Sequence, residues 1–292
     1  MNRLLNSTPI AVLALLVFII FIWYGAAIYL NSGVLIDKYE RQKTEWSFQL
    51  LVSDSWSMGR PVLPAPHQIF EDLKKSLFDQ KITSKRSLVY HGGITISSTL
   101  VGFLMGSVLG ILLAIGIVHL PTLNKSVLPW IIASQTIPIL AIAPMIIVVL
   151  GAIGLTGLLP KAFISAYLCF FPIVIGMVKG LRSPDPMYLD LMKTYNATQS
   201  QIFRKLRWPA STPFLFASFK VSIAISLVGA IVGELPAGAR AGLGARLLTG
   251  SYYGQTVQIW SALIVASVIA ATLVFLMSYM EKIVQKRMGA LI

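Results

Sequence analysis

The sequence predicts an all-α integral membrane protein with about six transmembrane helices, and three observations lead to that fold class. Of the 292 residues, 56% are hydrophobic and only 12% are charged, a composition typical of membrane proteins. Several apolar runs carry no charge and reach the roughly 20 residues that cross a bilayer core. Lysine and arginine gather between these runs, as they do in the cytoplasmic loops of membrane proteins.

The same features exclude several other classes. The net charge of +13 would indicate nucleic acid in a soluble protein. Charges that flank membrane spans account for it here, so we expect contact with membrane lipid and no nucleic-acid partner. The single cysteine, Cys169, excludes an intramolecular disulfide and a cysteine-rich metal site. Phosphate-loop, zinc-protease and nucleophile-elbow motifs are missing from the sequence. We therefore expect a chain that is not an enzyme and has no catalytic residue, cofactor or metal.

The first part of the chain is expected to contain one span and a long external segment. Residues 9–30 form an uncharged apolar run and are predicted to be the first transmembrane helix. Residues 1–8 are placed in the cytoplasm because Arg3 precedes the span. Residues 31–86 mix both signs of charge and are expected outside the cytoplasm. Within them, 67–78 should form an amphipathic helix, which either lies on the membrane surface or packs on the domain.

Residues 87–280 are predicted to form a core with five further transmembrane helices, followed by a cytoplasmic tail at 281–292. The first span of this core, 87–120, repeats glycine every four residues and should pack closely against another helix; these glycines are Gly102, Gly106 and Gly110. The uncharged stretch 126–160 is too long for one span. Its glycines indicate a break, and they are Gly151, Gly154 and Gly157. The remaining spans are expected near 126–150, 158–178, 213–233 and 256–280.

Two of these spans carry polar residues of interest. Gln135 and Pro138 make the span near 126–150 irregular, because polar groups and prolines at membrane depth need protein or water around them. This span should therefore face a partner subunit or a central solute path, unless neighbouring helices satisfy a simple kink. Lys220 lies about two turns inside the span at 213–233, and its side chain could extend back to the cytoplasmic surface.

Glu234 follows the span at 213–233 and is expected at its extracytoplasmic end. A carboxylate in that position is a functional candidate, although it can simply mark the bilayer boundary. It comes directly after Gly233 and before a glycine-rich loop that contains Arg240 and Arg246. The boundary role is the simpler interpretation. The alternative hypothesis is an outer gate, closed by a charged contact between Glu234 and one of these arginines.

The longest polar segment of the second half lies within residues 181–212, and it carries its own helix signals. Asp185 can cap a helix that Pro186 begins, and Asn196 can end that helix in a left-handed conformation. Thr198 and Gln201 have the spacing of a capping box. The second helix then has an apolar stripe and should stop at a proline; these residues are Ile202, Phe203, Leu206 and Pro209. The helix–turn–helix is either a basic loop on anionic lipid or a docking surface.

This segment resembles the EAA loop of ABC-importer permeases. Asp190 stands at the acidic position, Asn196-Ala197-Thr198 at the Gly-Ala-Ser position, and Pro209 at the end. Asn196 replaces the usual turn glycine, and Met192-Lys193 replaces the usual alanine-rich run. In that family the loop is the coupling helix, which inserts into the ATPase subunit. The resemblance thus implies that Asp190, Asn196, Ala197, Thr198, Ile202, Phe203, Leu206 and Pro209 couple this chain to an ATPase.

A wider resemblance covers most of the chain, because several short motifs occur in the order seen in permeases of the nitrate, sulfonate and taurine type. They include Leu63-Pro64, Ile137-Pro138, Phe171-Pro172, Val232-Gly233-Glu234 and Gly242-Leu243-Gly244. Close relatives of that type are thought to carry thiamine-pyrimidine precursors or riboflavin.

The resemblance implies a type I ABC importer permease fold in the bacterial plasma (inner) membrane. It also implies a pair of cytoplasmic ATP-binding subunits, an extracytoplasmic solute-binding protein and a second permease chain, expected to be another copy of this one. A secondary transporter or channel is the alternative, and a membrane scaffold is a third class. The few ionisable residues in the predicted spans speak against an ion-coupled carrier.

Overall fold

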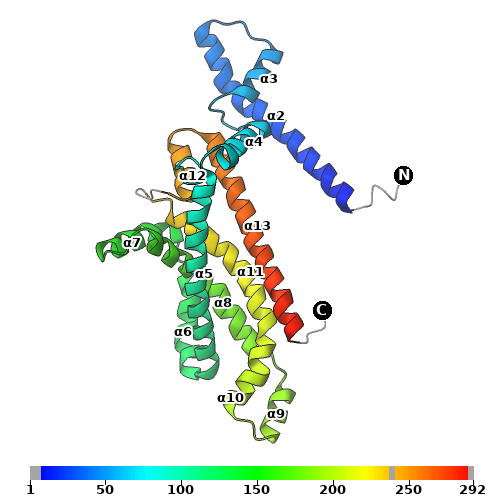
Figure 1. Ribbon diagram of the computed structural model, residues 1–292, viewed down its shortest axis with the longest axis vertical. Helices are drawn as coiled ribbons and strands as arrows, with labels where there is room; N and C mark the ends of the chain where they lie inside the picture. The colour runs from blue at the N-terminus through cyan, green and yellow to red at the C-terminus, as the bar shows by residue number, and fades with distance from the viewer. Residues whose placement is uncertain (1–7, 237–240, 289–292) are drawn as a thin grey trace. The chain divides into compact units, whose positions relative to one another are not determined.

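The computed structural model describes residues 8–236 and 241–288, and the regular elements in these ranges are helical (Figure 1). Five helical stretches are long and apolar enough to cross a membrane, and a bent helix pair can form a sixth span. The five contain, in chain order, α2 (Thr8–Gln42), α5 (Leu88–His119), α8 (Leu158–Leu181), α11 (Trp208–Gly233) and α13 (Thr256–Arg287). The predicted all-α membrane fold with about six spans is confirmed.

The chain divides into two compact units, which are described separately. The N-terminal unit comprises Met1–Tyr90 and Arg246–Val265, and the core unit comprises His91–Ala245 and Ala266–Ile292. Both candidate functional segments, 181–212 and the surroundings of Glu234, belong to the core unit.

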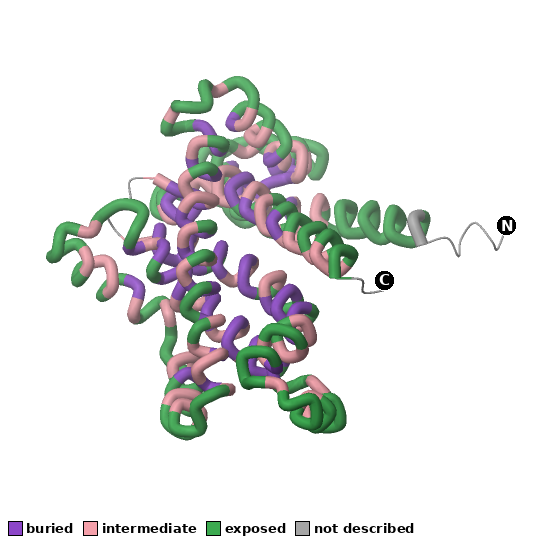
Figure 2. The backbone as a smooth tube through the Cα atoms, turned by 60° about the horizontal axis from the view of Figure 1, so that its bottom comes forward, coloured by how far each residue is buried: buried purple, intermediate pink, exposed green. Residues whose placement is uncertain are grey.

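In the N-terminal unit the first helix is longer than predicted. It continues from the expected end at residue 30 as far as Gln42, so the first part of the expected external segment is helical. The cause is a small apolar cluster in which Leu35 and Tyr39 of α2 pack against Leu51 of α3 (Phe48–Ser57). Residues 10–22 at the start of α2 are exposed throughout (Figure 2), as expected for a helix that faces lipid.

A buried asparagine joins the parts of this unit. The side-chain oxygen of Asn31 accepts hydrogen bonds from the backbone N–H groups of Val62 and Leu63, at 2.7 and 3.2 Å. Its amide nitrogen donates to the carbonyl oxygens of Leu63 and Ser55, at 3.0 and 3.3 Å. One side chain thus satisfies backbone groups of a proline-rich segment that has no ladder partner of its own.

The predicted amphipathic helix forms as α4 (Pro66–Lys74), followed by the π-helical segment η1 (Lys75–Asp79). Its expected apolar face, Ile69, Phe70, Leu73 and Leu77, is divided, because Ile69 is buried whereas Phe70 is exposed; Phe78, outside that face, is exposed too. The helix therefore packs on the unit with one side and presents aromatic rings on another.

In the core unit the glycine repeat of α5 contacts α8. A Cβ atom added at Gly102 would lie 2.4 Å from Ser165 Cβ, and one added at Gly106 would lie 2.3 Å from Cys169 Sγ. At Gly110 the nearest atom would be in Ile173, at 2.9 Å. The predicted close packing of this span is confirmed, since each glycine accommodates the neighbouring helix.

The packing of α8 against α11 follows the same rule. A Cβ atom at Gly229 would lie 2.7 Å from Ser165 Cα. Ser165 Oγ lies 2.8 Å from Ser226 Oγ, and the Ser226 hydroxyl donates to the Thr99 carbonyl oxygen of α5 at 2.9 Å. Small residues and hydroxyl groups thus connect the three helices where lipid provides no hydrophobic driving force.

The irregularity expected in the span near 126–150 is confirmed, and it is larger than a simple kink. The structure has two helices, α6 (Pro121–Ser134) and α7 (Ile139–Ala152), which are bent by 101° at the intervening break. Each has 14 residues and is therefore about 21 Å long, too short to cross a bilayer core of about 30 Å alone. The bend lies at residues 135–138, where Pro138 cannot continue α6. The predicted break after α7 is confirmed by the positive φ angles of Gly154 and Gly157, 84° and 74°.

Lys220 does not extend to the surface as a free cation. Its ammonium group lies 2.8 Å from Glu281 Oε2 of α13, and both side chains are partly buried. The pair compensates a charge inside α11 with an acid that lies 61 residues later in the chain.

The glycine repeat gives a prediction with a matched control on the same helix. We expect Gly106→Ala to lower the midpoint of thermal unfolding of the detergent-solubilised chain, because overpacking costs about 1–3 kcal/mol. Gly93→Ala has no heavy atom within 4 Å of the new Cβ, so it should leave the midpoint unchanged or raise it slightly. Equal shifts for the two variants would contradict the packing role of Gly106.

Candidate functional site

The predicted helix signals of residues 181–212 are confirmed in the structure. Asp185 Oδ1 accepts the Met187 N–H at 2.8 Å and caps α9 (Pro186–Thr194). Asn196 has a φ of 53°, the left-handed conformation that the sequence predicts. Thr198 and Gln201 form a reciprocal capping box at the start of α10 (Gln199–Ile202). These signals act within a few residues of chain, which is why the sequence alone reveals them.

The prediction that Pro209 ends the second helix is wrong. Helical structure continues from Gln199 to Gly233 without interruption, through the π-helical segment η2 (Phe203–Arg207) into α11. The Trp208 N–H bonds the Phe203 carbonyl, five residues back. This wider turn changes the helix register just before the proline, so the ring can be accommodated at the start of the next helix.

The apolar stripe expected on this helix is partly covered within the chain itself. Ile202 is only 4% exposed, and Phe203 packs against the buried cluster of the core unit. The Phe203 ring centroid lies 5.3 Å from that of His119 and 5.9 Å from that of Trp208. Leu206 is half-buried. The stripe turns inward because its helix is the first part of a membrane span and shares the span's inner face.

The exposed apolar surface of this segment lies instead on α9, the first helix of the predicted helix–turn–helix, whose apolar side chains were not among the expected docking residues. Four side chains one helical turn or less apart are exposed: Met187, Tyr188, Leu191 and Tyr195. We call them the α9 face. Tyr195 is 78% exposed. Asp190 lies on the same helix and pairs with Lys193 at 2.9 Å in solvent, so the acidic position of the motif is a surface residue.

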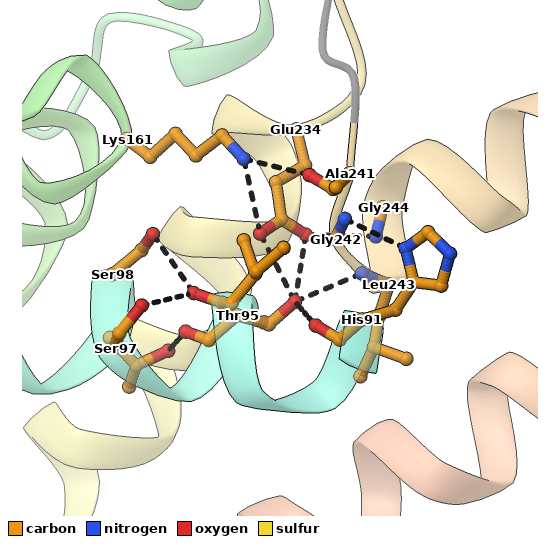
Figure 3. Close-up of polar contacts among 12 residues, drawn as sticks. His91, Thr95, Ser97, Ser98, Lys161, Glu234, Ala241, Gly242, Leu243 and Gly244 are labelled. Carbon is orange, nitrogen blue, oxygen red and sulfur yellow. Dashed lines mark hydrogen bonds and ion pairs between the residues drawn. The ribbon is translucent and has the colours of Figure 1, made fainter. Parts of the chain in front are cut away.

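Glu234 occupies a buried polar cluster formed by α5, α8 and the end of α11 (Figure 3). Its side chain is 0% exposed. Lys161 Nζ lies 3.6 Å from one carboxylate oxygen, the Gly244 N–H donates to the other at 3.0 Å, and Thr95 Oγ1 lies 2.9 and 3.1 Å from the two. A buried carboxylate requires such partners, because an unpaired one would be strongly destabilising.

The cluster holds the backbone of residues 241–244. His91 Nδ1 accepts the Gly242 N–H at 2.9 Å, and Thr95 Oγ1 accepts the Leu243 N–H at 2.9 Å. Lys161 Nζ donates to the Ala241 carbonyl at 2.8 Å. Together with the Gly244 contact, four successive residues each have a backbone group bound by a side chain of the cluster. We call this arrangement the Glu234 clamp.

Two glycines make the clamp possible. Gly242 has a φ of 126°, and an added Cβ would lie 2.1 Å from the Glu234 carboxyl carbon. At Gly244 an added Cβ would lie 2.3 Å from the Ile231 carbonyl oxygen. The Gly242-Leu243-Gly244 motif thus allows the loop to approach the carboxylate directly.

The charged partner of Glu234 in the described residues is a lysine that the sequence did not indicate. Arg240 lies outside the described residues. Arg246 belongs to the N-terminal unit, where it lines a polar cavity of about 350 Å³ together with Asp72. The ion-pair partner described is Lys161, 12% exposed. In the sequence, Lys161 is the first charge after the uncharged stretch 126–160. That position does not reveal its contact with Glu234, because the two residues are 73 positions apart.

A cavity of about 760 Å³ lies beside the clamp within the core unit. Among its lining residues are Ser97, Ser98, Thr156 and Lys161. Gln135 and Pro138 do not belong to the described lining of this cavity. They lie at the bend between α6 and α7, where the Gln135 amide donates to Ser134 Oγ at 3.3 Å. The structure therefore brings Glu234 together with Lys161 and Thr95, and places the other two predicted path residues at a separate position.

Comparison with known proteins identifies the family. Residues 106–290, well over half of the chain, match the family described as binding-protein-dependent transport system inner membrane component. The riboflavin transport system permease protein RibX of Chloroflexus aurantiacus is 30% identical over 222 residues, which cover 76% of this chain and 79% of that protein.

Two further relatives agree. The formylaminopyrimidine transport permease protein ThiX of Halalkalibacterium halodurans is 32% identical over 191 residues, 64% of this chain and 70% of that protein. A probable ABC transporter permease protein of Haemophilus influenzae is 28% identical over 220 residues, 75% of this chain and 87% of that protein.

The similarity extends over the helices that position the Glu234 clamp and the 181–212 segment, and it decides against a secondary transporter, a channel or a scaffold. The relatives are named as transport permeases, and their family works with a binding protein. The chain therefore belongs to the family of binding-protein-dependent transport system inner membrane components, and it is a multi-pass permease subunit of an ABC importer in the inner membrane.

Proposed function

We propose that this permease is driven by a pair of cytoplasmic ATP-binding subunits, which dock on the segment 181–212. The α9 face carries this proposal, since it exposes three large side chains on a short helix and a fourth, Tyr195, at the C-cap of that helix. An amphipathic helix of this kind suits a hydrophobic groove on a partner. The ATPases hydrolyse ATP, and this chain supplies the solute path.

The other predicted coupling residues then have positioning roles. Asp185, Asn196 and the Thr198 capping box fix the direction of α9 relative to α11, because they determine the helix ends and the turn between them. Ala197 lies within that turn. Phe203 connects the segment to the buried cluster, and Ile202 beside it is buried, so a movement of α9 would be passed to the span through this contact. Leu206 and Pro209 belong to the same continuous helix.

For the solute we propose a small organic molecule, delivered by an extracytoplasmic binding protein. The relatives are named for formylaminopyrimidine and riboflavin, and a cavity of about 760 Å³ is within the size range of small-molecule sites. We further propose that a second copy of this chain completes the path. The helix α7 exposes several large apolar residues that a partner or lipid would cover: Leu140, Met145, Val148 and Val149. Gln135 and Pro138 lie at the start of this surface.

Glu234 is proposed to act in the outer gate through the clamp. It does so by holding residues 241–244, which lead into the first turn of α12 (Leu243–Tyr252), rather than through a contact with Arg240 or Arg246. In this form of the hypothesis, the gate depends on the buried Glu234 carboxylate and not on an ion pair between Glu234 and an arginine.

The docking proposal predicts the effect of a charge on the α9 face. Leu191→Asp should leave membrane insertion intact and abolish the solute-stimulated part of ATP hydrolysis by the reconstituted complex. The reason is that a carboxylate buried in an apolar contact costs several kcal/mol. Leu191→Met is the matched control, because it keeps an apolar side chain of similar volume, and it should retain stimulation. Wild-type stimulation in Leu191→Asp would contradict docking by this face.

The proposed topology predicts the side from which introduced thiols react. A cysteine at Gln199 should be labelled by an impermeant reagent only from the cytoplasm, and a cysteine at Ser53 only from outside. Both positions are exposed, and the native Cys169 is buried, so the background reaction is low. Labelling of both positions from the same side in intact cells and inverted vesicles would show the topology to be wrong.

A further inference from the structure

We propose that the cavity beside the Glu234 clamp is a solute site that selects a small solute with an anionic head group, and that Lys161 binds this head group. The inference deepens the proposed import function and rests on it. It concerns the charge class of the solute, which neither the family nor the names of the relatives determine for this chain.

The first observation is the asymmetric exposure of the ion pair. Glu234 is completely buried, whereas Lys161 is 12% exposed and lines the cavity. The carboxylate of Glu234 also makes hydrogen bonds with Thr95 and with the Gly244 N–H. The pair is neutral as a whole, yet it presents its positive end to the cavity. Lys161 is the charged side chain in the described lining, so the local potential favours an anion.

The second observation concerns the remaining capacity of the ammonium group. Lys161 Nζ donates to the Ala241 carbonyl at 2.8 Å and lies 3.6 Å from Glu234 Oε1. An ammonium group has three N–H donors, so one donor is left for a ligand after both contacts. Glu234 and the Ala241 carbonyl hold the group in place, and the cavity gives a solute access to it.

The third observation is the polarity of the neighbouring wall. Ser97 and Ser98 donate their hydroxyl protons to the Ile94 carbonyl, at 2.7 and 3.2 Å. Their oxygen lone pairs are therefore available to N–H or O–H groups of a solute. The first turn of the 24-residue helix α8 also borders the cavity, and its backbone N–H groups add to the positive potential. A solute with an anionic end and a few donor groups fits these partners.

The test uses reagents of opposite charge. A cysteine at Ser97, which lines the cavity, is introduced into the full-length chain in detergent. Its rates of reaction with a sulfonate-bearing and a trimethylammonium-bearing methanethiosulfonate are measured. Gln199→Cys, an exposed position on the same unit outside the cavity lining, gives the reference ratio. We expect the anionic-to-cationic rate ratio to be roughly tenfold higher at Ser97→Cys, the low end of the enrichment found in charged clefts.

The role of Lys161 is separated from folding by removing both charges together. Lys161→Met alone leaves a buried carboxylate without its counter-ion and should destabilise the chain. Lys161→Met/Glu234→Gln keeps the size of both side chains and should recover the unfolding midpoint, yet the rate ratio at Ser97→Cys should fall to the reference value. A rate ratio at Ser97→Cys that stays high in the double variant would overturn the inference. Equal rate ratios at Ser97→Cys and Gln199→Cys in the chain that keeps Lys161 and Glu234 would also overturn it.

The labelling ratio needs neither ATP nor a receptor, so its outcome is independent of the proposed coupling. An absent anion preference would leave import by this permease untouched. Absence of solute-stimulated ATP hydrolysis in the wild-type complex would count against the proposed function and would not alter the ratio. An unreactive Ser97→Cys together with a reactive Gln199→Cys would show that the cavity is closed to solutes of this size and would also overturn the inference.

Discussion

The burial of the Glu234 carboxylate is the constraint on which the arrangement of the core unit depends. A carboxylate removed from water is tolerated only with a counter-charge and hydrogen-bond donors around it. Lys161 of α8, Thr95 of α5 and the Gly244 N–H supply them, so three separate parts of the chain must meet the end of α11 at one point. Shifting any of these elements by a turn would remove one of the partners of the carboxylate. The ion pair therefore specifies the register of the helices more than it adds stability.

The helices can meet this requirement because their contact surfaces are small. Gly102 and Gly106 allow α8 to approach α5, and Gly229 allows α11 to approach Ser165. In a bilayer, close van der Waals contact and hydrogen bonds between helices replace the hydrophobic effect as the source of association. The serine contacts between α8, α5 and α11 lie along the same helices as the clamp. Close helix packing and the polar cluster around Glu234 thus involve the same three helices, α5, α8 and α11, and each favours the same arrangement of them.

Local features were predictable from the sequence, and contacts between distant segments were not. Asp185, Asn196 and Thr198 act on backbone groups within three residues, so their roles could be inferred correctly. The orientation of Ile202 and Phe203 could not, because it depends on whether the helix stops at Pro209 or continues into the span. The π-helical segment that decides this has no clear sequence signature. Likewise, Glu234 could be recognised as a candidate, but its partner Lys161 is brought to it only by the packing of α8.

The uninterrupted helix from Gln199 to Gly233 has a mechanical consequence. It contains 35 residues and therefore acts as a rod about 50 Å long. One end lies directly after the Thr198 capping box, and the other lies directly before Glu234. A helix ended by Pro209 would have had a joint between these two places, at which rotation of one half could be lost. Because helical structure continues through the π-helical segment, no loop separates the Thr198 capping box from the span that ends beside Glu234.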